Sequence, residues 1–332
     1  MLVPTPIAGP GWKYERASES AIALDALLRV HGLSIAAGSA LESHILGAMR
    51  VVAAGERRQD EKDVRDDFRS LVGVHEIANL ILSVKDHPSF PALLPHLELL
   101  NSGNALQMTK SHGADAATNK LFELFAATLA MHCGTAIEVD DPNYTDGKNP
   151  DVLFTAGGRR WGIACKVLHS THPEGFLTHL KKGVAQIEDS PAECGIVMFN
   201  LKNVLRHDDI WPIVPLPEGS GTGLGAWPDP NMAFSFLFAD MDEIGRRLSE
   251  QLTNAPHELD AIFKGRKSLP GFLLWGHCVS GVLLNQQPTP TSVRLLKAVR
   301  VGDIASSDAR VLECLNWAAF HDSPVRGPRP QM

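Results

Sequence analysis

The sequence has little that would place the protein outside the cell or in a membrane. Its five cysteines are odd in number and widely spaced, and none forms a CxxC or Cys/His pair, so neither a disulfide framework nor a zinc site is expected. No apolar run approaches the roughly 20 residues that span a bilayer. The first residues, MLVPTPIAGPGWKYE, lack the charged and apolar regions of a signal peptide. We therefore expect a soluble, cytoplasmic protein with no membrane partner.

Motifs of nucleotide-cofactor proteins are also missing. No GxxxxGK[ST] or GxGxxG segment follows a predicted strand. The glycine-rich stretch GSGTGLG at Gly219–Gly225 has no apolar helix after it, and we interpret it as a flexible insertion. The formal net charge of −7 does not indicate a nucleic-acid binder, although a binding face needs only a local basic surface.

What is present is a globular composition, with 332 residues of which 44% are hydrophobic and 21% charged. From about residue 17 to 112, apolar residues recur at three- and four-residue spacing, which predicts helices. Later, predicted strands alternate with predicted helices, which favours an α/β core. The helical part is interpreted as a packing or dimerisation element, with substrate binding as the alternative. We expect a helical N-terminal domain over 1–115, an α/β domain over 116–322 with a Pro/Gly-rich insertion at about 212–232, and a disordered tail over 323–332.

The stretch from Asn119 to Asn200 carries the elements with a chemical pattern. An amphipathic helix is followed by the alternating segment TAIEVDD, which predicts a strand. DVLFTAGGRRWGIACKVL predicts a hairpin that turns at Ala156-Gly157-Gly158. FLTHLKKGVAQIEDS then predicts a helix, and CGIVMFNLKNVL a buried strand. A later apolar strand, Phe272–Val282, is expected to return to the same sheet.

An acid and a lysine meet on the predicted hairpin. Asp151 opens its first strand and Lys166 lies near the end of the second, so pairing counted back from the turn brings both to one edge of the sheet. A carboxylate there can hold Mg²⁺ through oxygen, and a lysine beside it can orient water or stabilise charge on a phosphate. Glu123, on the preceding helix, can approach the same edge. The alternative is that Asp151 caps a turn and Lys166 ends a strand in solvent.

The order of helix with Glu, strand, Pro-Asp, hairpin, x-x-Lys and helix with Gln resembles the PD-(D/E)xK nuclease superfamily, over about residues 116–200. The resemblance implies a restriction-endonuclease-like mixed sheet flanked by helices. It also implies hydrolysis of phosphodiester bonds, in DNA rather than RNA, with Mg²⁺ or Mn²⁺ as cofactor, and a role such as restriction or phage defence. Position by position, it implies Asp151 and Glu123 as metal ligands, Lys166 as the catalytic lysine and Gln186 as a helix glutamine near the site.

One position departs from the family pattern. Two residues before the lysine the family has Asp or Glu, whereas this chain has Ala164, whose methyl group cannot bind a metal. Three interpretations of Ala164 remain. The alanine is a deliberate replacement that inactivates a nuclease, the second acid comes from elsewhere in the chain, or the fold has lost cleavage and kept binding. The acids considered for the second interpretation are Glu123, Glu138, Asp140 and Asp141.

Local charge favours a phosphate-bearing partner. Between Gly157 and Lys182 five basic residues stand against one acid, Glu174, which suits contacts to a nucleic-acid backbone. The alternative is that these basic residues only form a solvated helix face and turn. Cleavage of two strands would suit a homodimer through the helical domain, and the second candidate function is a non-catalytic nucleic-acid-binding or assembly module that kept the fold. The expected nucleic-acid contacts are Arg159, Arg160, Lys181, Lys182 and Lys202.

Overall fold

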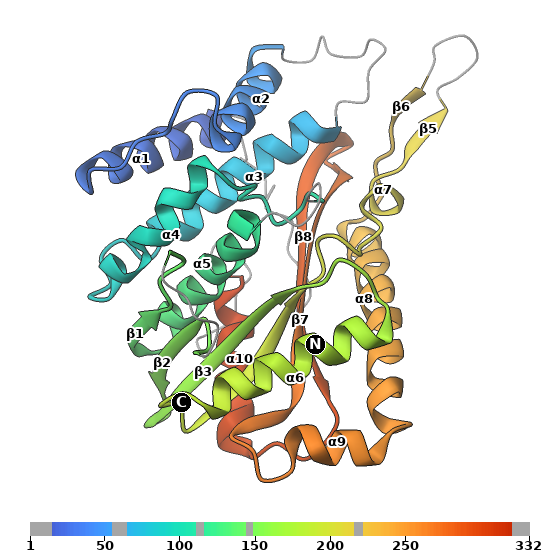
Figure 1. Cartoon of the computed structure of the whole chain (residues 1–332). Coiled ribbons are helices and arrows are strands. Elements are labelled where there is room, and N and C mark those ends of the chain that lie inside the picture. The colour runs from blue at the N-terminus through green and yellow to red at the C-terminus, as the bar shows by residue number, and fades with distance from the viewer. Residues whose placement is uncertain (1–14, 55–64, 111–115, 144–148, 216–221, 321–332) are drawn as a thin grey trace.

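The N-terminal part of the chain is helical (Figure 1). The computed structural model describes residues 15–54, 65–110, 116–143, 149–215 and 222–320, so the expected tail lies outside the described residues. Among all of these described residues, no helix combines the length and apolarity that crossing a membrane requires. Pro91 and Pro95 fall within the first two positions of short helices, where a missing N–H has no helical partner to lose. The N-terminal elements are α1 (Glu15–Val30), α2 (Ala40–Ala54), α3 (Arg65–Leu82), η2 (Phe90–Leu93), α4 (Leu94–Glu98) and η3 (Leu99–Asn101).

A mixed sheet of six strands forms the centre of the described fold, in the order β1-β2-β3-β4-β7-β8. The first three strands are antiparallel neighbours, β4 and β7 run parallel to β3, and β8 returns antiparallel to β7. The α/β class with a mixed sheet is therefore confirmed. The strands are β1 (Thr135–Val139), β2 (Val152–Ala156), β3 (Arg159–Val167), β4 (Cys194–Asn200), β7 (Ser268–Leu284) and β8 (Gln287–Arg300).

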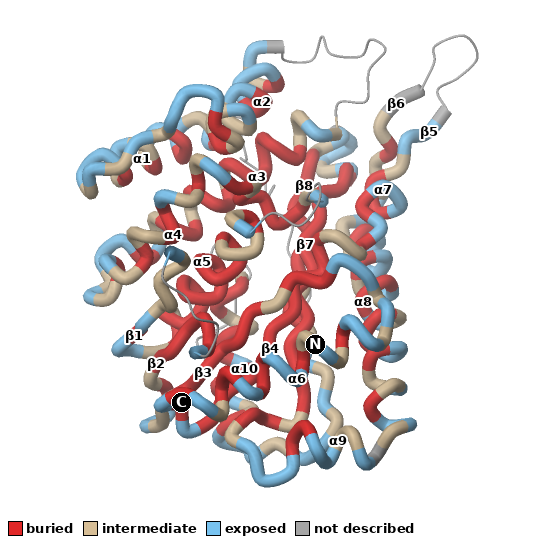
Figure 2. The backbone as a smooth tube through the Cα atoms, viewed as in Figure 1, coloured by how far each residue is buried: buried red, intermediate tan, exposed pale blue. Residues whose placement is uncertain are grey.

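Helices cover both faces of this sheet (Figures 1 and 2). Successive side chains of a strand point to opposite faces, so Ile163 and Cys165 enter one core while Ala164 enters the other. The first core also contains residues of α1, α3 and α4, so the N-terminal helices pack on the sheet through a shared interior. On that face lie α5 (Ala116–Cys133) and α10 (Ser306–Ala318), and on the other lie α6 (Pro173–Glu188), α8 (Pro230–Thr253) and α9 (Pro256–Phe263).

Most expected elements are present, with two differences. The hairpin turns at Gly157 and Gly158, whose φ angles of 57° and 75° are those that glycine adopts without strain, and Phe272–Val282 lies in β7 as expected. Strand β8 was not anticipated, because Pro288 and Pro290 argue against a strand unless it lies at a sheet edge, as this one does. A short helix, α7 (His207–Ile210), precedes the Pro/Gly-rich stretch, which itself contains an antiparallel pair, β5 (Ile213–Pro215) and β6 (Thr222–Leu224).

Gly195 allows β3 and β4 to lie close together beside the site. A Cβ at this position would overlap the carbonyl oxygen of Gly162 and would lie 2.9 Å from Cγ2 of Ile187. Because the first of these is backbone, Gly195→Ala is expected to lower the free energy of unfolding by about 3 kcal/mol, measured by urea denaturation. Gly175→Ala is the control, since its Cβ would have no neighbour within 4 Å. Equal stability of the two variants would contradict the close approach.

Candidate active site

The site lies where β2 begins and β3 continues past it. Val152 is the partner of Ile163, so Cys165 lies beyond the start of β2 and its N–H has no strand partner there. It donates instead to Oδ2 of Asp151 at 2.6 Å. Asp151 is only 4% exposed, so its buried carboxylate takes the place of a strand partner and accepts the hydrogen bond of this N–H.

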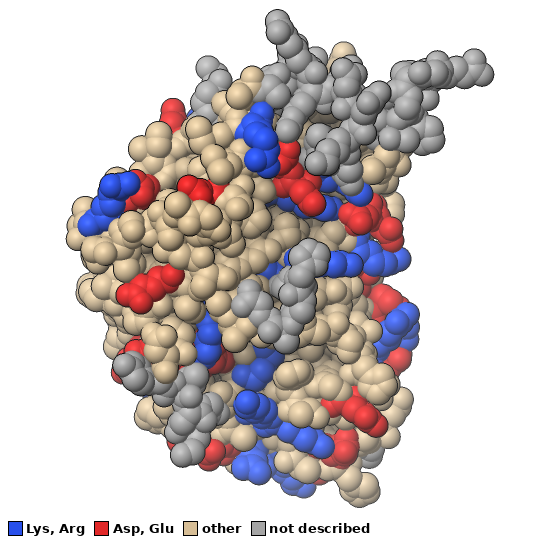
Figure 3. Space-filling model, turned by 45° about the horizontal axis from the view of Figure 1, so that its top comes forward, with Lys and Arg blue, Asp and Glu red and all other residues tan. Residues whose placement is uncertain are grey.

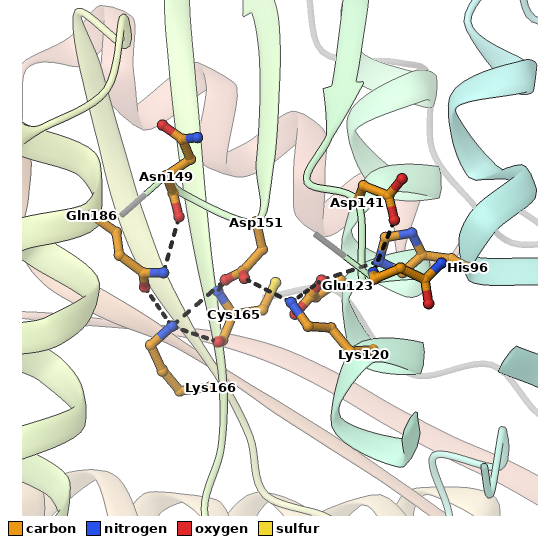
Figure 4. Close-up of polar contacts among 10 residues, drawn as sticks. His96, Lys120, Glu123, Asp141, Asn149, Asp151, Cys165, Lys166 and Gln186 are labelled. Carbon is orange, nitrogen blue, oxygen red and sulfur yellow. Dashed lines mark hydrogen bonds and ion pairs between the residues drawn. The ribbon is translucent and has the colours of Figure 1, made fainter. Parts of the chain in front are cut away.

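Lys166 is held against this carboxylate from the α6 side of the sheet (Figure 4). Its Nζ lies 3.6 Å from Oδ2 of Asp151, and it donates to Oε1 of Gln186 at 2.7 Å and to the carbonyl oxygen of Cys165 at 2.9 Å. The amide of Gln186 donates in turn to the carbonyl oxygen of Asn149 at 2.9 Å. The structure therefore brings Asp151, Lys166 and Gln186 together.

Helix α5 brings Glu123 to the same point from the opposite face, together with Lys120 one turn earlier. Nζ of Lys120 lies 2.9 Å from Oε1 and 3.2 Å from Oε2 of Glu123, and 4.0 Å from Oδ1 of Asp151. Burial raises the pKa of Glu123 well above its usual value, and the charge of Asp151 raises it further. Burial acts to lower the pKa of Lys120, but the charge of Glu123, its hydrogen bond and the charges of Asp151 and Asp140 together outweigh burial, so that pKa is raised. Lys120 was not among the residues expected from the sequence.

His96 is a second residue that the sequence did not indicate. It comes from α4, is fully buried, and places Nε2 3.0 Å from Oε2 of Glu123. Burial lowers the pKa of His96 to about 4, and the charge of Lys120 acts in the same direction. The imidazole is therefore neutral at pH 7, and it fixes the carboxyl group of Glu123 from the N-terminal helices.

Ala164 stands in packed core where the family has an acid. It is 0% exposed and belongs to the apolar cluster that includes Val184 and Val197. A Cβ added to Gly183 of α6 would lie 3.3 Å from the Cβ of Ala164, so the helix passes directly over it. A longer side chain at this position would have to move α6 or neighbouring core residues.

The other acids considered from the sequence lie at the rim or point elsewhere. Glu138 pairs with Arg160, with 2.5 Å between Oε1 and Nη2. Asp140 and Asp141 follow β1, and the N–H of Asp140 donates to the carbonyl oxygen of Asp151 at 3.0 Å. Within the described residues, no three His, Cys, Asp or Glu side chains are arranged to hold a metal ion. Two buried carboxylates with a cation between them nevertheless fit Mg²⁺, which commonly takes one or two carboxylates and keeps several waters.

The expected nucleic-acid contacts occupy different surroundings. Lys181 and Lys182 are exposed on α6, the helix that carries Gln186, and Lys181 lies 3.4 Å from Glu258. Arg159 pairs with Asp308 at 2.6 Å, so its charge is locally balanced. Figure 3 shows Lys and Arg side chains gathered in a band on one face of the molecule.

Lys202 corrects the expectation. It is 1% exposed, and its Nζ donates to the carbonyl oxygen of Leu106 at 2.9 Å, so it cannot contact a nucleic acid at the surface. The hydrogen bond of this lysine holds the segment before α5 against the end of β4.

The same buried region contains His207, whose Nε2 lies 2.7 Å from the carbonyl oxygen of Lys202. Burial lowers the pKa of His207 from 6.5 to about 4. Between these values the unfolded chain binds the proton and the folded protein does not, so stability falls as the pH falls from 6.5 to 4. His207 alone is expected to contribute about 1.4 kcal/mol per pH unit to this loss. Urea midpoints at pH 7, 6 and 5 measure it, and His207→Asn should have the shallower slope; an unchanged slope would count against this assignment.

Comparison with known proteins gives no assignment. The sequence matches no protein-family model and no curated protein. No solved structure matches the fold.

Proposed function

We propose that this protein is a nuclease with a restriction-endonuclease-like fold that hydrolyses phosphodiester bonds in DNA. The proposal is carried by one observation: Asp151, Glu123, Lys166 and Gln186 converge on one sheet edge from separate elements. Two carboxylates can hold a divalent metal ion, and such an ion together with the Lys166 ammonium group can stabilise negative charge on a phosphate. A role in restriction or phage defence belongs to the proposal through the resemblance.

Mg²⁺ or Mn²⁺ is the proposed cofactor, with Asp151 and Glu123 as its ligands. When bound, such an ion supplies Lewis-acid polarisation and lowers the pKa of a bound water. Lys166 would stabilise the negative charge that develops on the phosphoryl group. Gln186 keeps the Lys166 ammonium in place, and the Cys165 N–H keeps the Asp151 carboxylate in place. His96 does the same for Glu123.

Support for a nucleic-acid substrate comes from the surface beside the site. Lys182 lies one helical turn before Gln186 on α6 and is exposed, so positive charge is available next to the proposed catalytic residues. Cutting both strands of a duplex would require two copies of the site. We place the contact of such a homodimer on α1 and α2, where Ile22, Leu46 and Met49 are exposed.

The second candidate is a non-catalytic nucleic-acid-binding module. Two observations favour it: Ala164 leaves one ligand position without an oxygen, and Lys120 already places a positive charge beside both carboxylates. A fold with this site can keep its basic surface and bind DNA without cutting it.

The experiment is cleavage of supercoiled plasmid and of single-stranded DNA in Mg²⁺ or Mn²⁺. The wild-type chain is compared with Lys166→Met and with the control Lys264→Met, which changes an exposed lysine far along the chain on the C-terminal side of α9. Cleavage by the wild type and the control but not by Lys166→Met supports the proposal. DNA binding without cleavage by any of the three favours the second candidate.

A further inference from the structure

The space between the two carboxylates contains the ammonium group of Lys120. This group touches both oxygens of Glu123 and lies 4.0 Å from Oδ1 of Asp151 (Figure 4). Lys120 and Glu123 are three residues apart on α5, so the helix itself aims both side chains at Asp151. Lys120 therefore occupies the place at which a divalent cation would reach both acids.

We propose that Lys120 is a displaceable internal cation, which holds Asp151 and Glu123 together in the resting protein and leaves them when a divalent metal ion is taken up. The inference rests on the proposed function, because it takes these two acids as the metal ligands. It adds a residue, Lys120, to which neither the sequence pattern nor the resemblance gives a role.

Displacement follows from how the carboxylate oxygens are used. Oε1 of Glu123 is bonded to Lys120, and Oε2 is bonded to Lys120 and lies beside His96. Oδ2 of Asp151 accepts from the N–H of Cys165. A Mg²⁺ ion with carboxylate oxygens at about 2.1 Å would compete with the Lys120 ammonium for the same oxygens and repel its charge, so the two cations cannot share the site.

Lys120 has a way out of this position. Its side chain is 19% exposed, whereas that of Glu123 is 6% exposed, so the lysine reaches solvent more readily than the acid does. Lysine carries a compact charged group on a flexible stem. Asp140 lies close enough to act on the charge of Lys120, and it offers that group a partner at the rim. Because Ala164 supplies no carboxylate, a metal ion would have fewer ligands at this site. The competition between the two cations therefore favours the Lys120 ammonium group more strongly.

The test measures Mn²⁺ binding to the full chain from the electron paramagnetic resonance signal of free Mn²⁺. Lys120→Met keeps the length of the side chain and removes its charge, so it should bind Mn²⁺ about tenfold more tightly than the wild type or more. Lys120→Arg keeps the charge and should stay as weak as the wild type. Lys264→Met, which also removes one positive charge, is the control. Adding Asp151→Asn to Lys120→Met should abolish the gain.

Two results would overturn the inference: equal Mn²⁺ affinity of wild type and Lys120→Met, or an equal gain in Lys120→Met and Lys120→Arg. Thermal denaturation of each variant shows that it is folded, and Lys120→Gln replaces Lys120→Met if the latter is not. DNA cleavage by the same proteins separates the two proposals. Cleavage by the wild type with no affinity gain in Lys120→Met removes the inference and leaves the function. An affinity gain in Lys120→Met, without cleavage by any of the proteins, removes the proposed function and leaves the inference about Lys120.

Discussion

Asp151→Asn is expected to reduce DNA cleavage by about 10³-fold while the protein remains folded. Asparagine has nearly the same shape, and its side-chain oxygen can still accept the Cys165 N–H that Asp151 accepts at 2.6 Å. What is lost is the negative charge, which lies 3.6 Å from Lys166 and 4.0 Å from Lys120. The variant therefore removes a proposed metal ligand and leaves two ammonium groups beside one acid, Glu123.

Initial rates of plasmid nicking in Mg²⁺, at several protein concentrations, measure this effect. Asp86→Asn is the matched control, because it makes the same chemical change at an exposed position after α3. Far-ultraviolet circular dichroism of both variants checks the fold. Wild-type rates in Asp151→Asn would show that the carboxylate is a structural acceptor only, and the proposed site would then have no basis.

Ala164→Glu is expected to destabilise the protein by about 3 kcal/mol or more rather than to restore a missing ligand. Ala164 has no exposed surface and lies under Gly183 of α6. A glutamate there must both enlarge a filled core and place a carboxyl group among Val184 and Val197, where no hydrogen-bond donor is provided by those side chains.

Urea denaturation measures this change, and Ala298→Glu provides the same substitution at a less buried strand position in β8. Unchanged stability of Ala164→Glu, together with new metal-dependent cleavage, would mean that the alanine stands in place of an acid for which the site is built. The packing around Ala164 instead favours a second acid supplied by a different part of the chain, or a fold that has lost cleavage.

The meeting of Asp151 and Lys166 could be predicted because it depends on local information. The glycines at Gly157 and Gly158 define the turn, and counting from the turn sets the register of the hairpin. Gln186 was expected only through the family resemblance, and the crossover between the parallel strands β3 and β4 is what brings α6 over the sheet.

Lys120, His96 and Lys202 could not be placed from the sequence because their contacts depend on packing between distant segments. The sequence pattern around Lys120 is typical of a solvated lysine on an amphipathic helix. Only the packing of α5 on the sheet brings this lysine to Asp151. His96 lies 27 residues from Glu123 in the chain. Lys202 follows a buried strand and reads as its exposed end, but the segment that contains Leu106 covers it.

The contact between His96 of α4 and Glu123 of α5 also limits how this protein can change over evolution or by engineering. The N-terminal helices supply His96 to the proposed active site and apolar residues to the core beneath it. A version trimmed to the sheet and its later helices would expose the apolar side of α5 to water and leave Glu123 without its imidazole neighbour. The proposed site therefore draws on both parts of the chain, and recombination near residue 115 would separate His96 from Glu123.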